Sequence, residues 1–557
     1  MYTISFKTEN GGEIKVKAQK GDSILELAEK AGVALDAPCS GNGTCGKCRM
    51  RLISGDVSVT HSPRLSNADY REGYRLACQS AVSGDAQFLV PAVSSAFKSD
   101  IRTADISSPQ KRSRFERILC ELFSFGIKRG TAQSGLGLAV DIGTTTVTAA
   151  LLDLDSGSVI SECSLGNGQI KYGADVINRI IRSSKPGGRE KLRAAILYET
   201  LVPMIDKMCA DAQTEPESIK RIVIAGNTTM EHLFVGADAE SIRLEPYVPE
   251  FLELHGKTAG ELGIPADKNA PVIFAPNVGS YVGGDITAGV LASRIRDSDE
   301  MTLFIDLGTN GEIVLGNRDF ALCCACSAGP AFEGGDISCG MRATTGAVDA
   351  CEIDPISLEP TLSVIGGGKP LGLCGSGLIS VISELFRCKA INAKGKFTAK
   401  NRRIRYDDYG GASYVIAFAG ENGAERDIEL NESDIDNFIR AKAAIFSAVL
   451  TMLGQLDMDK DAIDRVIIAG GIGSGIDIKK AISIGMLPLL PEEKYSYIGN
   501  SSLTGACAVL LSDAAEERLF ELGRDMTYIE LSLEPGYMDE FVAACFLPHT
   551  DAKLFEV

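Results

Sequence analysis

The same strand–turn–strand pattern occurs twice in this chain. In the first copy an apolar strand that begins at Leu138 runs into a turn at 141–146. In the second copy an apolar strand ends at Asp306, before a turn at 308–310. Glycine in such a turn lets backbone N–H groups approach phosphate oxygens, and threonine or asparagine adds further donors. One copy alone is weak evidence, because Asp and Gly occur in many ordinary turns. Two copies predict a duplicated domain whose turns face each other and clamp one nucleotide.

A third glycine-rich turn follows the late apolar strand at 465–469. Its glycines lack the G-x-G-x-x-G register that a dinucleotide requires. The residues expected to bind the nucleotide therefore fall into three groups: Gly143, Thr144 and Thr145; Gly308, Thr309, Asn310 and Gly311; and Gly470, Gly471 and Gly473.

Three aspartates are the candidates for catalysis. Asp141 and Asp306 each end a strand, where a carboxylate can hold Mg²⁺ through water. Asp285 opens an expected helix after two glycines, where it could position Mg²⁺ or the attacking water. The alternative for Asp285 is electrostatic, since an acidic side chain in the first turn also stabilises a helix.

Four cysteines in the N-terminal part of the chain have an iron–sulfur spacing. Cys39, Cys45 and Cys48 follow one another as C-x5-C-x2-C in a loop of small residues, and Cys78 comes later. Small residues let the backbone curl around a cluster and point N–H groups at its sulfurs. This block resembles the 2Fe-2S ferredoxin family, which implies a β-grasp fold with these four thiolates on the cluster. A structural zinc site is the alternative, but such sites usually present two C-x2-C pairs.

The residues before the cysteine loop predict a hairpin and a helix. Segments 2–8 and 13–17 alternate apolar and polar residues around an Asn-Gly-Gly turn, which is typical of a hairpin. Ser23 and Glu26 form an expected capping box. The helix that follows has one apolar face, made by Ile24, Leu27, Ala28 and Ala31.

Charge and composition exclude several classes of protein. With 45% hydrophobic and 23% charged residues, the chain is neither fibrous nor disordered as a whole. Its net charge of −18 repels phosphate backbones, so nucleic acid is not an expected partner. No apolar run approaches the roughly 18 residues of a membrane span, and the N-terminus does not look like a leader. We therefore expect a cytoplasmic protein without a membrane partner, whose 16 cysteines are metal ligands and reduced thiols.

The three turns together resemble the superfamily of acetate and sugar kinases, heat-shock chaperone ATPases and actin. This resemblance implies two ribonuclease-H-like halves with ATP in the cleft, the first two turns on the phosphates and the third beside the adenosine. Further stretches resemble a narrower family, the reductive activators of corrinoid proteins. These stretches are 167–180, 226–233, 280–289, 326–335, 372–379 and 546–551.

The expected fold class is multidomain, α+β followed by α/β. We expect a 2Fe-2S ferredoxin-like domain over 1–92 and a linker with a short helix over 93–134. A duplicated ribonuclease-H-like ATPase domain of the actin and sugar-kinase type should cover 135–557, with halves of roughly 135–299 and 300–557. Serine-rich and basic stretches indicate the linker, and an amphipathic segment near 115–125 indicates its helix.

The family resemblance also implies an activity. The protein would use ATP and Mg²⁺ to deliver one electron through the 2Fe-2S cluster and convert cob(II)alamin to cob(I)alamin. Its partners would be a corrinoid protein of a methyl-transfer system and an upstream low-potential electron donor, and a homodimer stays open. Ser327, in a loop after the second turn, could face the docked corrinoid; the alternative is a helix N-cap before Pro330.

Two other functions stay open at this point. One is a small-molecule kinase with a redox-regulated domain, although no segment supplies a distinct sugar or acyl site. The other is a binding protein that senses ATP and redox state. Cys323, Cys324, Cys326 and Cys339 are expected as core thiols rather than a second metal site, and His232 as a packed side chain rather than a cleft residue.

Overall fold

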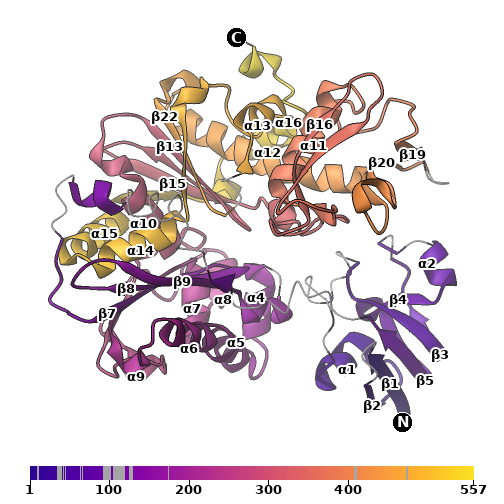
Figure 1. The fold of residues 1–557 in the computed structure, drawn as a ribbon, viewed down its shortest axis with the longest axis horizontal. Helices are drawn as coiled ribbons and strands as arrows, with labels where there is room; N and C mark the ends of the chain where they lie inside the picture. Colours follow the sequence, from indigo (N-terminus) through magenta and orange to yellow (C-terminus); the bar gives the residue numbers. More distant parts are fainter. Residues whose placement is uncertain are drawn as a thin grey trace.

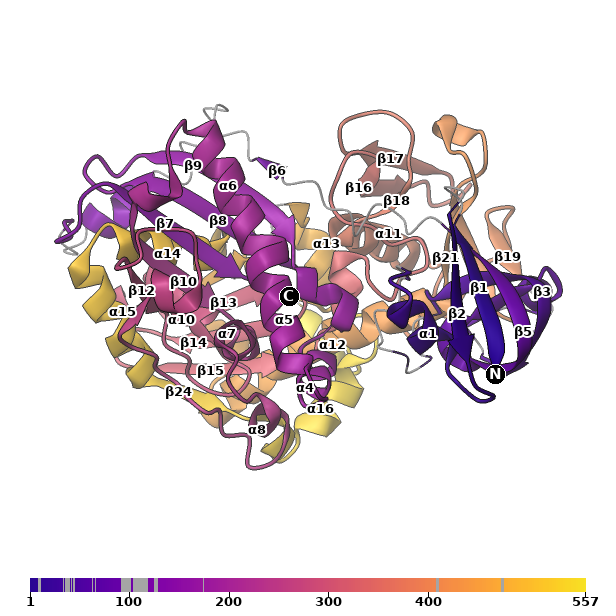
Figure 2. The same ribbon diagram turned by 90° about the horizontal axis from the view of Figure 1, so that it is seen from below.

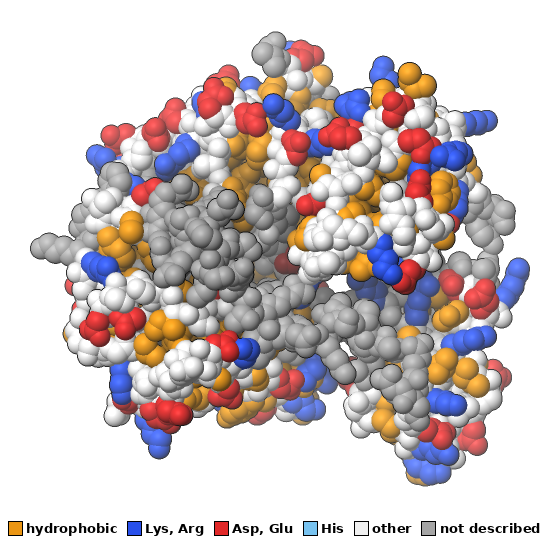
Figure 3. Space-filling model, in the orientation of Figure 1, with side chains coloured by type: hydrophobic (Ala, Val, Ile, Leu, Met, Phe, Trp, Pro, Cys, Tyr) orange, Lys and Arg blue, Asp and Glu red, His pale blue; other side chains and the backbone are white. Residues whose placement is uncertain are grey.

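The structure is a computed structural model. It describes residues 1–8, 12–33, 35, 41, 43, 46–62, 64–65, 67–91, 102–103, 119–124, 129–173, 175–406, 410–471 and 475–556. Figure 1 shows a small N-terminal sheet domain beside a larger body that contains two further large sheets. On the face drawn in Figure 3, the acidic and basic side chains of the described residues are interspersed.

The N-terminal sheet has the strand order β2-β1-β5-β3-β4. Its elements are β1 (Tyr2–Thr8), β2 (Glu13–Ala18), α1 (Ile24–Lys30), β3 (Arg49–Val59), α2 (Asn67–Arg71), β4 (Tyr74–Leu76) and β5 (Ser80–Val90). The antiparallel pairing of β1 with β2 confirms the predicted hairpin. Helix α1 begins where expected and buries Ile24, Leu27 and Ala28. The capping box is wrong, since the Ser23 side chain makes no capping hydrogen bond.

The first half of the larger body is built on a seven-stranded sheet of order β11-β12-β10-β7-β8-β9-β6. Its strands are β6 (Arg102–Thr103), β7 (Leu136–Ile142), β8 (Thr146–Asp153), β9 (Val159–Gly166), β10 (Ile219–Gly226), β11 (Lys257–Thr258) and β12 (Pro271–Phe274). Its helices are α4 (Val176–Ser183), α5 (Gly188–Ile196), α6 (Val202–Asp211), α7 (Thr228–Val235), α8 (Glu240–Arg243), α9 (Ala259–Leu262) and α10 (Gly284–Ser293). In Figure 2, α5 and α6 cover the outer face of this sheet, and their apolar residues share one core with its strands.

The second half is built on a six-stranded sheet of order β23-β22-β13-β14-β15-β24. These strands are β13 (Thr302–Leu307), β14 (Gly311–Gly316), β15 (Ala321–Cys326), β22 (Arg465–Ala469), β23 (Tyr495–Gly499) and β24 (Met526–Ile529). Two three-stranded sheets extend it: β16 (Ala347–Ile353), β17 (Pro360–Val364) and β18 (Gly372–Leu373); and β19 (Ile404–Tyr406), β20 (Ala412–Ala417) and β21 (Ile428–Asn431). Its helices are α11 (Gly375–Arg387), α12 (Glu432–Gln455), α13 (Ile478–Ser483), α14 (Ser501–Leu510), α15 (Asp513–Asp525) and α16 (Tyr537–Ala544).

The two large sheets repeat one topology. In the first, β7, β8 and β9 form an antiparallel meander and β10 pairs with β7 in parallel. In the second, β13, β14 and β15 form the same meander and β22 pairs with β13 in parallel. The predicted duplication is therefore present in the fold, and each copy of the turn joins the first two strands of its meander.

Helices α10 and α14 lie side by side between the two sheets (Figure 1). Glycines permit this close contact: a Cβ on Gly505 of α14 would lie 2.6 Å from the carbonyl carbon of Ala288 in α10. Gly289 likewise packs under Phe304 of β13, where a Cβ would lie 3.0 Å from the ring. Apolar residues of both helices and both sheets form one buried cluster, so the halves share a core.

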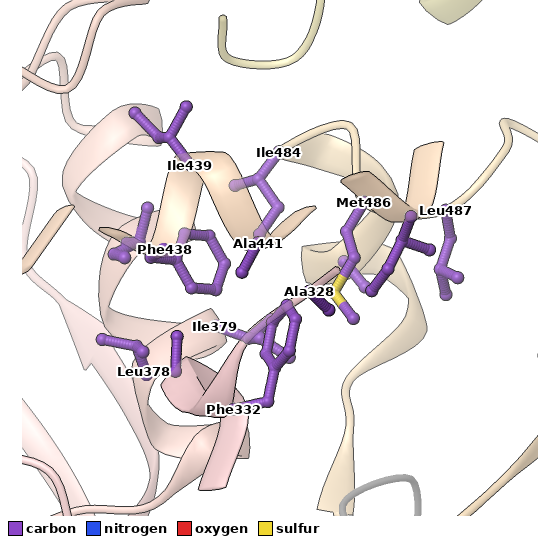
Figure 4. Packing of buried hydrophobic residues seen from close by; sticks show 14 of the residues in the cluster. Ala328, Phe332, Leu378, Ile379, Phe438, Ile439, Ala441, Ile484, Met486 and Leu487 are labelled. Atoms are coloured by element: carbon purple, nitrogen blue, oxygen red, sulfur yellow. The ribbon is translucent and has the colours of Figure 1, made fainter. Parts of the chain in front are cut away.

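The core of the second half surrounds α11 and α12. Figure 4 shows Phe332 and Phe438 within this core, where their rings meet edge to face at 5.6 Å between centroids. Helix α12 is long and apolar enough to cross a membrane, the one described helix of which this is true. Its most apolar window is 72% buried inside the protein, as expected for a core helix.

The expected linker does more than connect the domains. Within its described residues, β6 pairs antiparallel with β9 at the edge of the first large sheet. A helix is present at 119–124, and its residues Leu119 and Leu122 are buried in the core shared by the two halves. Part of the segment 93–134 is thus built into the larger body.

Truncation of a buried leucine in this core should destabilise the protein strongly. Leu378 of α11 is 1% exposed and belongs to the cluster in Figure 4. We expect L378A to lower the free energy of unfolding by about 2–5 kcal/mol, through lost burial and a residual cavity. Chemical denaturation of the full-length protein measures this change. The matched variant L533A, at a leucine 63% exposed, should change it by less than about 0.5 kcal/mol.

Candidate nucleotide cleft and iron–sulfur site

A cavity of about 510 Å³ lies between the two halves of the larger body. This volume is in the range of sites that bind small molecules and cofactors. The cavity brings together residues from all three predicted turns and Asp285 from the start of α10. The residues of the turns are Asp141, Gly143, Thr144, Thr145, Asp306, Gly308, Thr309, Asn310, Gly470 and Gly471. Two predicted residues are not part of this lining. Gly311 is buried at the start of β14, where a Cβ would meet Cys326 Sγ at 2.8 Å, and Gly473 lies outside the described residues.

Residues of the stretch 167–180 hold the first turn in place. The Gly143 N–H donates to Thr146 O at 3.1 Å and closes the turn. Asn167 Nδ2 donates to Gly143 O at 2.9 Å, and the buried Arg179 donates through Nη2 to Thr144 O at 2.5 Å. Because these hydrogen bonds hold the carbonyl groups of Gly143 and Thr144, the turn can present N–H and hydroxyl groups to the cavity.

The second turn and the third turn meet at Asp306. The Gly308 N–H donates to Asn310 O at 3.0 Å, which closes the second turn. Gly470, directly after β22, has φ +91°, and a Cβ there would lie 2.8 Å from Asp306 Oδ1. Any other residue at 470 would therefore be strained and would displace the carboxylate.

Three partly buried carboxyl groups line the cleft, those of Asp141, Asp285 and Asp306. Burial raises the pKa of Asp141 to about 6, although hydrogen bonds from Asn500 and Ser502 lower it again. Burial raises the pKa of Asp306 to about 7 and that of Asp285 to about 8, and the charge of Asp141 adds to both shifts. Acids that repel one another at a buried site are stabilised by a cation, so the cluster suits a positively charged ligand.

The distances between these three carboxyl groups decide whether a cation is bound directly or through water. Among the described residues, no three His, Cys, Asp or Glu side chains converge closely enough to hold a metal ion directly. A magnesium ion usually keeps several waters and takes only one or two carboxylates. Asp141, Asp285 and Asp306 therefore fit a hydrated cation rather than a closed protein cage.

Several residues of the cleft were missed by the sequence analysis. Asn500 Nδ2 donates to Asp141 Oδ2 at 2.8 Å, Ser502 Oγ to Asp141 Oδ1 at 3.0 Å, and Ser501 Oγ to Asp306 Oδ2 at 3.3 Å. Glu312 and Glu333 also line the cavity. The available signal was the polar run after β23, directly before an apolar helix.

Two of the four predicted cluster cysteines are described, and they lie together. Cys48 comes just before β3, and Cys78 lies in the 3-10 helix Ala77–Gln79; their sulfurs are 3.3 Å apart. Gly41, with φ +93°, lies beside Cys78: a Cβ there would be in ordinary van der Waals contact with Cys78 Cβ, at 3.9 Å. Adjacent thiols beside a glycine loop fit a cluster. Cys39 and Cys45 lie outside the described residues.

The remaining candidate residues lie away from the cleft lining. Ser327 is exposed, and it is not the expected N-cap, because the 3-10 helix Pro330–Glu333 is preceded by Gly329. His232 is buried, contacts Thr228 O through Nδ1 at 2.7 Å and stacks on Phe251. Cys323, Cys324 and Cys326 are buried in β15, as expected of core thiols.

Family models match three parts of the chain. Residues 7–83 match the 2Fe-2S iron–sulfur cluster binding domain, which spans all four predicted cysteine ligands. Residues 136–298 match the RACo middle region. Residues 300–557 match the C-terminal domain of RACo, the ASKHA domain.

Full-length comparisons agree with these matches. A solved structure of a reductive activator for corrinoid, iron–sulfur protein is 39% identical, with a TM-score of 0.71 over 100% of both chains. The chain belongs to the family of reductive activators of corrinoid proteins. This membership confirms the resemblance, the ferredoxin domain and the ATPase fold predicted from the sequence.

Two relatives of this activator family extend the comparison. The corrinoid activation enzyme RamQ of Eubacterium limosum is 35% identical over 417 residues, which cover 73% of this chain and 69% of that protein. The [Co(II) methylated amine-specific corrinoid protein] reductase of Methanosarcina barkeri is 23% identical over 425 residues, or 70% and 73% of the two chains. A 2Fe-2S cluster and ATP are thus the cofactors of this activator.

The raised pKa of Asp306 predicts how pH affects stability in the metal-free, nucleotide-free protein. The folded state keeps a proton that the unfolded state loses between pH 3.8 and about 7, so stability falls as pH rises through this window. We expect D306N to be more stable than the wild type at about pH 8 and to lose that advantage at about pH 5. Denaturant midpoints at both pH values measure this difference.

The matched control is D319N, because Asp319 is exposed and lies outside the cavity lining. Its stability should follow that of the wild type at both pH values. A stabilisation by D306N that is equal at both pH values would contradict the prediction.

Proposed function

We propose that the protein reactivates a corrinoid protein of a methyl-transfer system. It delivers one electron through its 2Fe-2S cluster, with ATP, and converts inactive cob(II)alamin to cob(I)alamin. The observation that carries this proposal is the presence, on one chain of the corrinoid-activator family, of a cysteine-loop domain and a duplicated nucleotide cleft. Relatives named as a corrinoid activation enzyme and a Co(II) corrinoid protein reductase support it.

An energy source is needed because the electron has to move uphill. Ferredoxin-type clusters have potentials near about −400 mV. The proposal places the cobalt couple lower, and each 100 mV of difference then costs about 2.3 kcal/mol for one electron. ATP offsets this cost by linkage, since a nucleotide that binds one cleft conformation better shifts the affinity for the partner.

The residues of the cleft have separate roles in this proposal. Thr144 and Thr145 of the first turn, together with Thr309 and Asn310 of the second, donate hydrogen bonds to the phosphates. Asp141 and Asp306 hold the waters of a Mg²⁺ ion, and Asp285 orients that ion or the attacking water. Gly470 and Gly471, with Gly473, leave room for the adenosine beside β22.

The cluster site depends on Cys39, Cys45, Cys48 and Cys78. A 2Fe-2S cluster bound there supplies a one-electron carrier. The proposal has the electron come from an upstream low-potential donor and pass through this cluster to the partner.

The partner side of the proposal concerns the loop after β15. Ser327 is exposed on this loop, and the proposal has it face the corrinoid. We assign 1–92 to the cluster domain, 93–134 to the connection and 135–557 to the ATPase domain. We place the protein in the cytoplasm, because no disulfide joins the cysteines in the part of the chain that the structure describes. A homodimer would leave each cleft complete within one chain.

The proposal predicts ATP-dependent reduction of cobalt. A corrinoid protein in the cob(II)alamin form is mixed anaerobically with the reconstituted full-length protein and a strong reductant, with and without Mg-ATP. Absorbance and EPR should show conversion to cob(I)alamin only with ATP. A phosphorylated metabolite in place of cobalt reduction would favour a kinase, and ATP turnover indifferent to any corrinoid partner would favour a sensor.

Two substitutions should separate the cluster from the cleft. C48S should abolish the 2Fe-2S absorption and the cobalt reduction but leave nucleotide binding intact, because Cys48 lies in the N-terminal domain. The matched variant C120S changes an exposed cysteine outside the ligand spacing and should retain the 2Fe-2S absorption and the cobalt reduction. D141N should leave the cluster spectrum intact and reduce ATP turnover by roughly tenfold or more. Full turnover in D141N would contradict the assigned cleft.

A further inference from the structure

Glu333 joins the two predicted phosphate turns across the cleft. Thr145 Oγ1 of the first turn lies 2.8 Å from Glu333 Oε2, and Thr309 Oγ1 of the second turn lies 3.0 Å from the same oxygen. The two threonine hydroxyls are themselves 2.7 Å apart. Three oxygen atoms from three chain segments thus form a closed triangle between the halves.

The number of available protons sets the protonation state of Glu333 in which every side of this triangle is a hydrogen bond. Each threonine hydroxyl carries one proton, so two protons are available for three oxygen–oxygen contacts. All three contacts become hydrogen bonds when the carboxyl group of Glu333 carries the third proton. Burial raises the pKa of Glu333, while hydrogen bonds from Thr145 and Thr309 and the charges of Arg342 and Arg179 lower it.

The triangle competes directly with a nucleotide. Thr145 and Thr309 are the hydroxyls proposed to donate to phosphate oxygens, and a hydroxyl whose one proton is used within the triangle cannot donate to phosphate as well. Glu333 Oε2 therefore takes the place on both turns that a phosphate oxygen would take.

The chain around Glu333 connects this contact to the outside of the molecule. Phe332, one residue earlier, is anchored against Phe438 of α12 in the core (Figure 4). Gly334, one residue later, has φ +79°. On the other side of the same 3-10 helix, Ser327 is exposed. A change at Glu333 thus acts on a short segment that reaches from the cleft to the surface.

We propose that Glu333 is a latch that closes the two phosphate turns on each other in the nucleotide-free protein and that ATP must displace. Displacement frees Thr145 and Thr309 for the phosphates and releases the end of the segment 327–335 from the cleft. This inference rests on the proposed ATP cleft and adds the residue through which nucleotide binding reaches the surface loop.

Substitution of Glu333 tests the latch by nucleotide affinity. In calorimetric titrations of the full-length protein with its cluster reconstituted, a non-hydrolysable ATP analogue with Mg²⁺ should bind E333A about fivefold or more tightly than the wild type, within the usual range of coupling between sites. The control D336A truncates an exposed acid directly after this segment and should bind as the wild type does. Equal affinity in E333A would overturn the latch. Weaker affinity would also overturn it, since Glu333 would then hold the nucleotide or its metal.

Hydrogen exchange on the wild type tests the same proposal without a substitution. Amides of the segment 327–335 should exchange faster when the protein is saturated with the ATP analogue, because their anchor in the cleft has gone. Absence of this rise in the saturated protein would overturn the latch. If the wild type and both variants bind no nucleotide, the proposed cleft itself is wrong. The titrations distinguish this outcome from a cleft that binds nucleotide equally well with and without Glu333, in which only the latch is wrong.

Discussion

The contact between α10 and α14 is the constraint on which the cleft depends. Gly505 lets the two helices approach until a side chain would collide with Ala288, and the apolar faces of both helices merge into the core shared by the halves. The first turn of α10 supplies Asp285, and the start of α14 supplies Asn500 and Ser502. Because the two helices are fixed against each other, the side chains of Asp285, Asn500 and Ser502 are fixed relative to one another in the cavity.

The sequence predicted the parts of this arrangement that local pattern encodes. The turns after β7 and β13 were visible because glycine, threonine and aspartate recur in the same register after two apolar strands. The cysteine loop was visible because ligand spacing is itself a local property. Duplicated topology followed from these repeats, and the comparisons confirmed the family and the fold.

What the sequence did not predict depends on contacts between distant segments. Asn500 reaches Asp141 from the other half of the body, and Glu333 reaches Thr145 in the same way, so neither has a nearby partner in the chain. Leu119 and Leu122 lie in the segment predicted as a linker, yet they are buried in a core whose other members come from both halves. The capping box failed for a different reason: Ser23 pairs with Ala81 in an isolated bridge, which ties the start of α1 to β5.

Three helices begin at the cavity: α10 near Asp285, α11 at Gly375 and Ser376, and α14 after Asn500. The unpaired N–H groups at a helix N-terminus carry a partial positive charge and attract anions. On a chain with net charge −18, a polyphosphate approaching the surface is repelled. Inside the cleft the converging helix ends offset part of the repulsion from Asp141, Asp285 and Asp306, and the cation that suits these acids would offset more of it. The cleft can therefore admit a highly charged anion together with its cation, although the molecule as a whole carries a net negative charge.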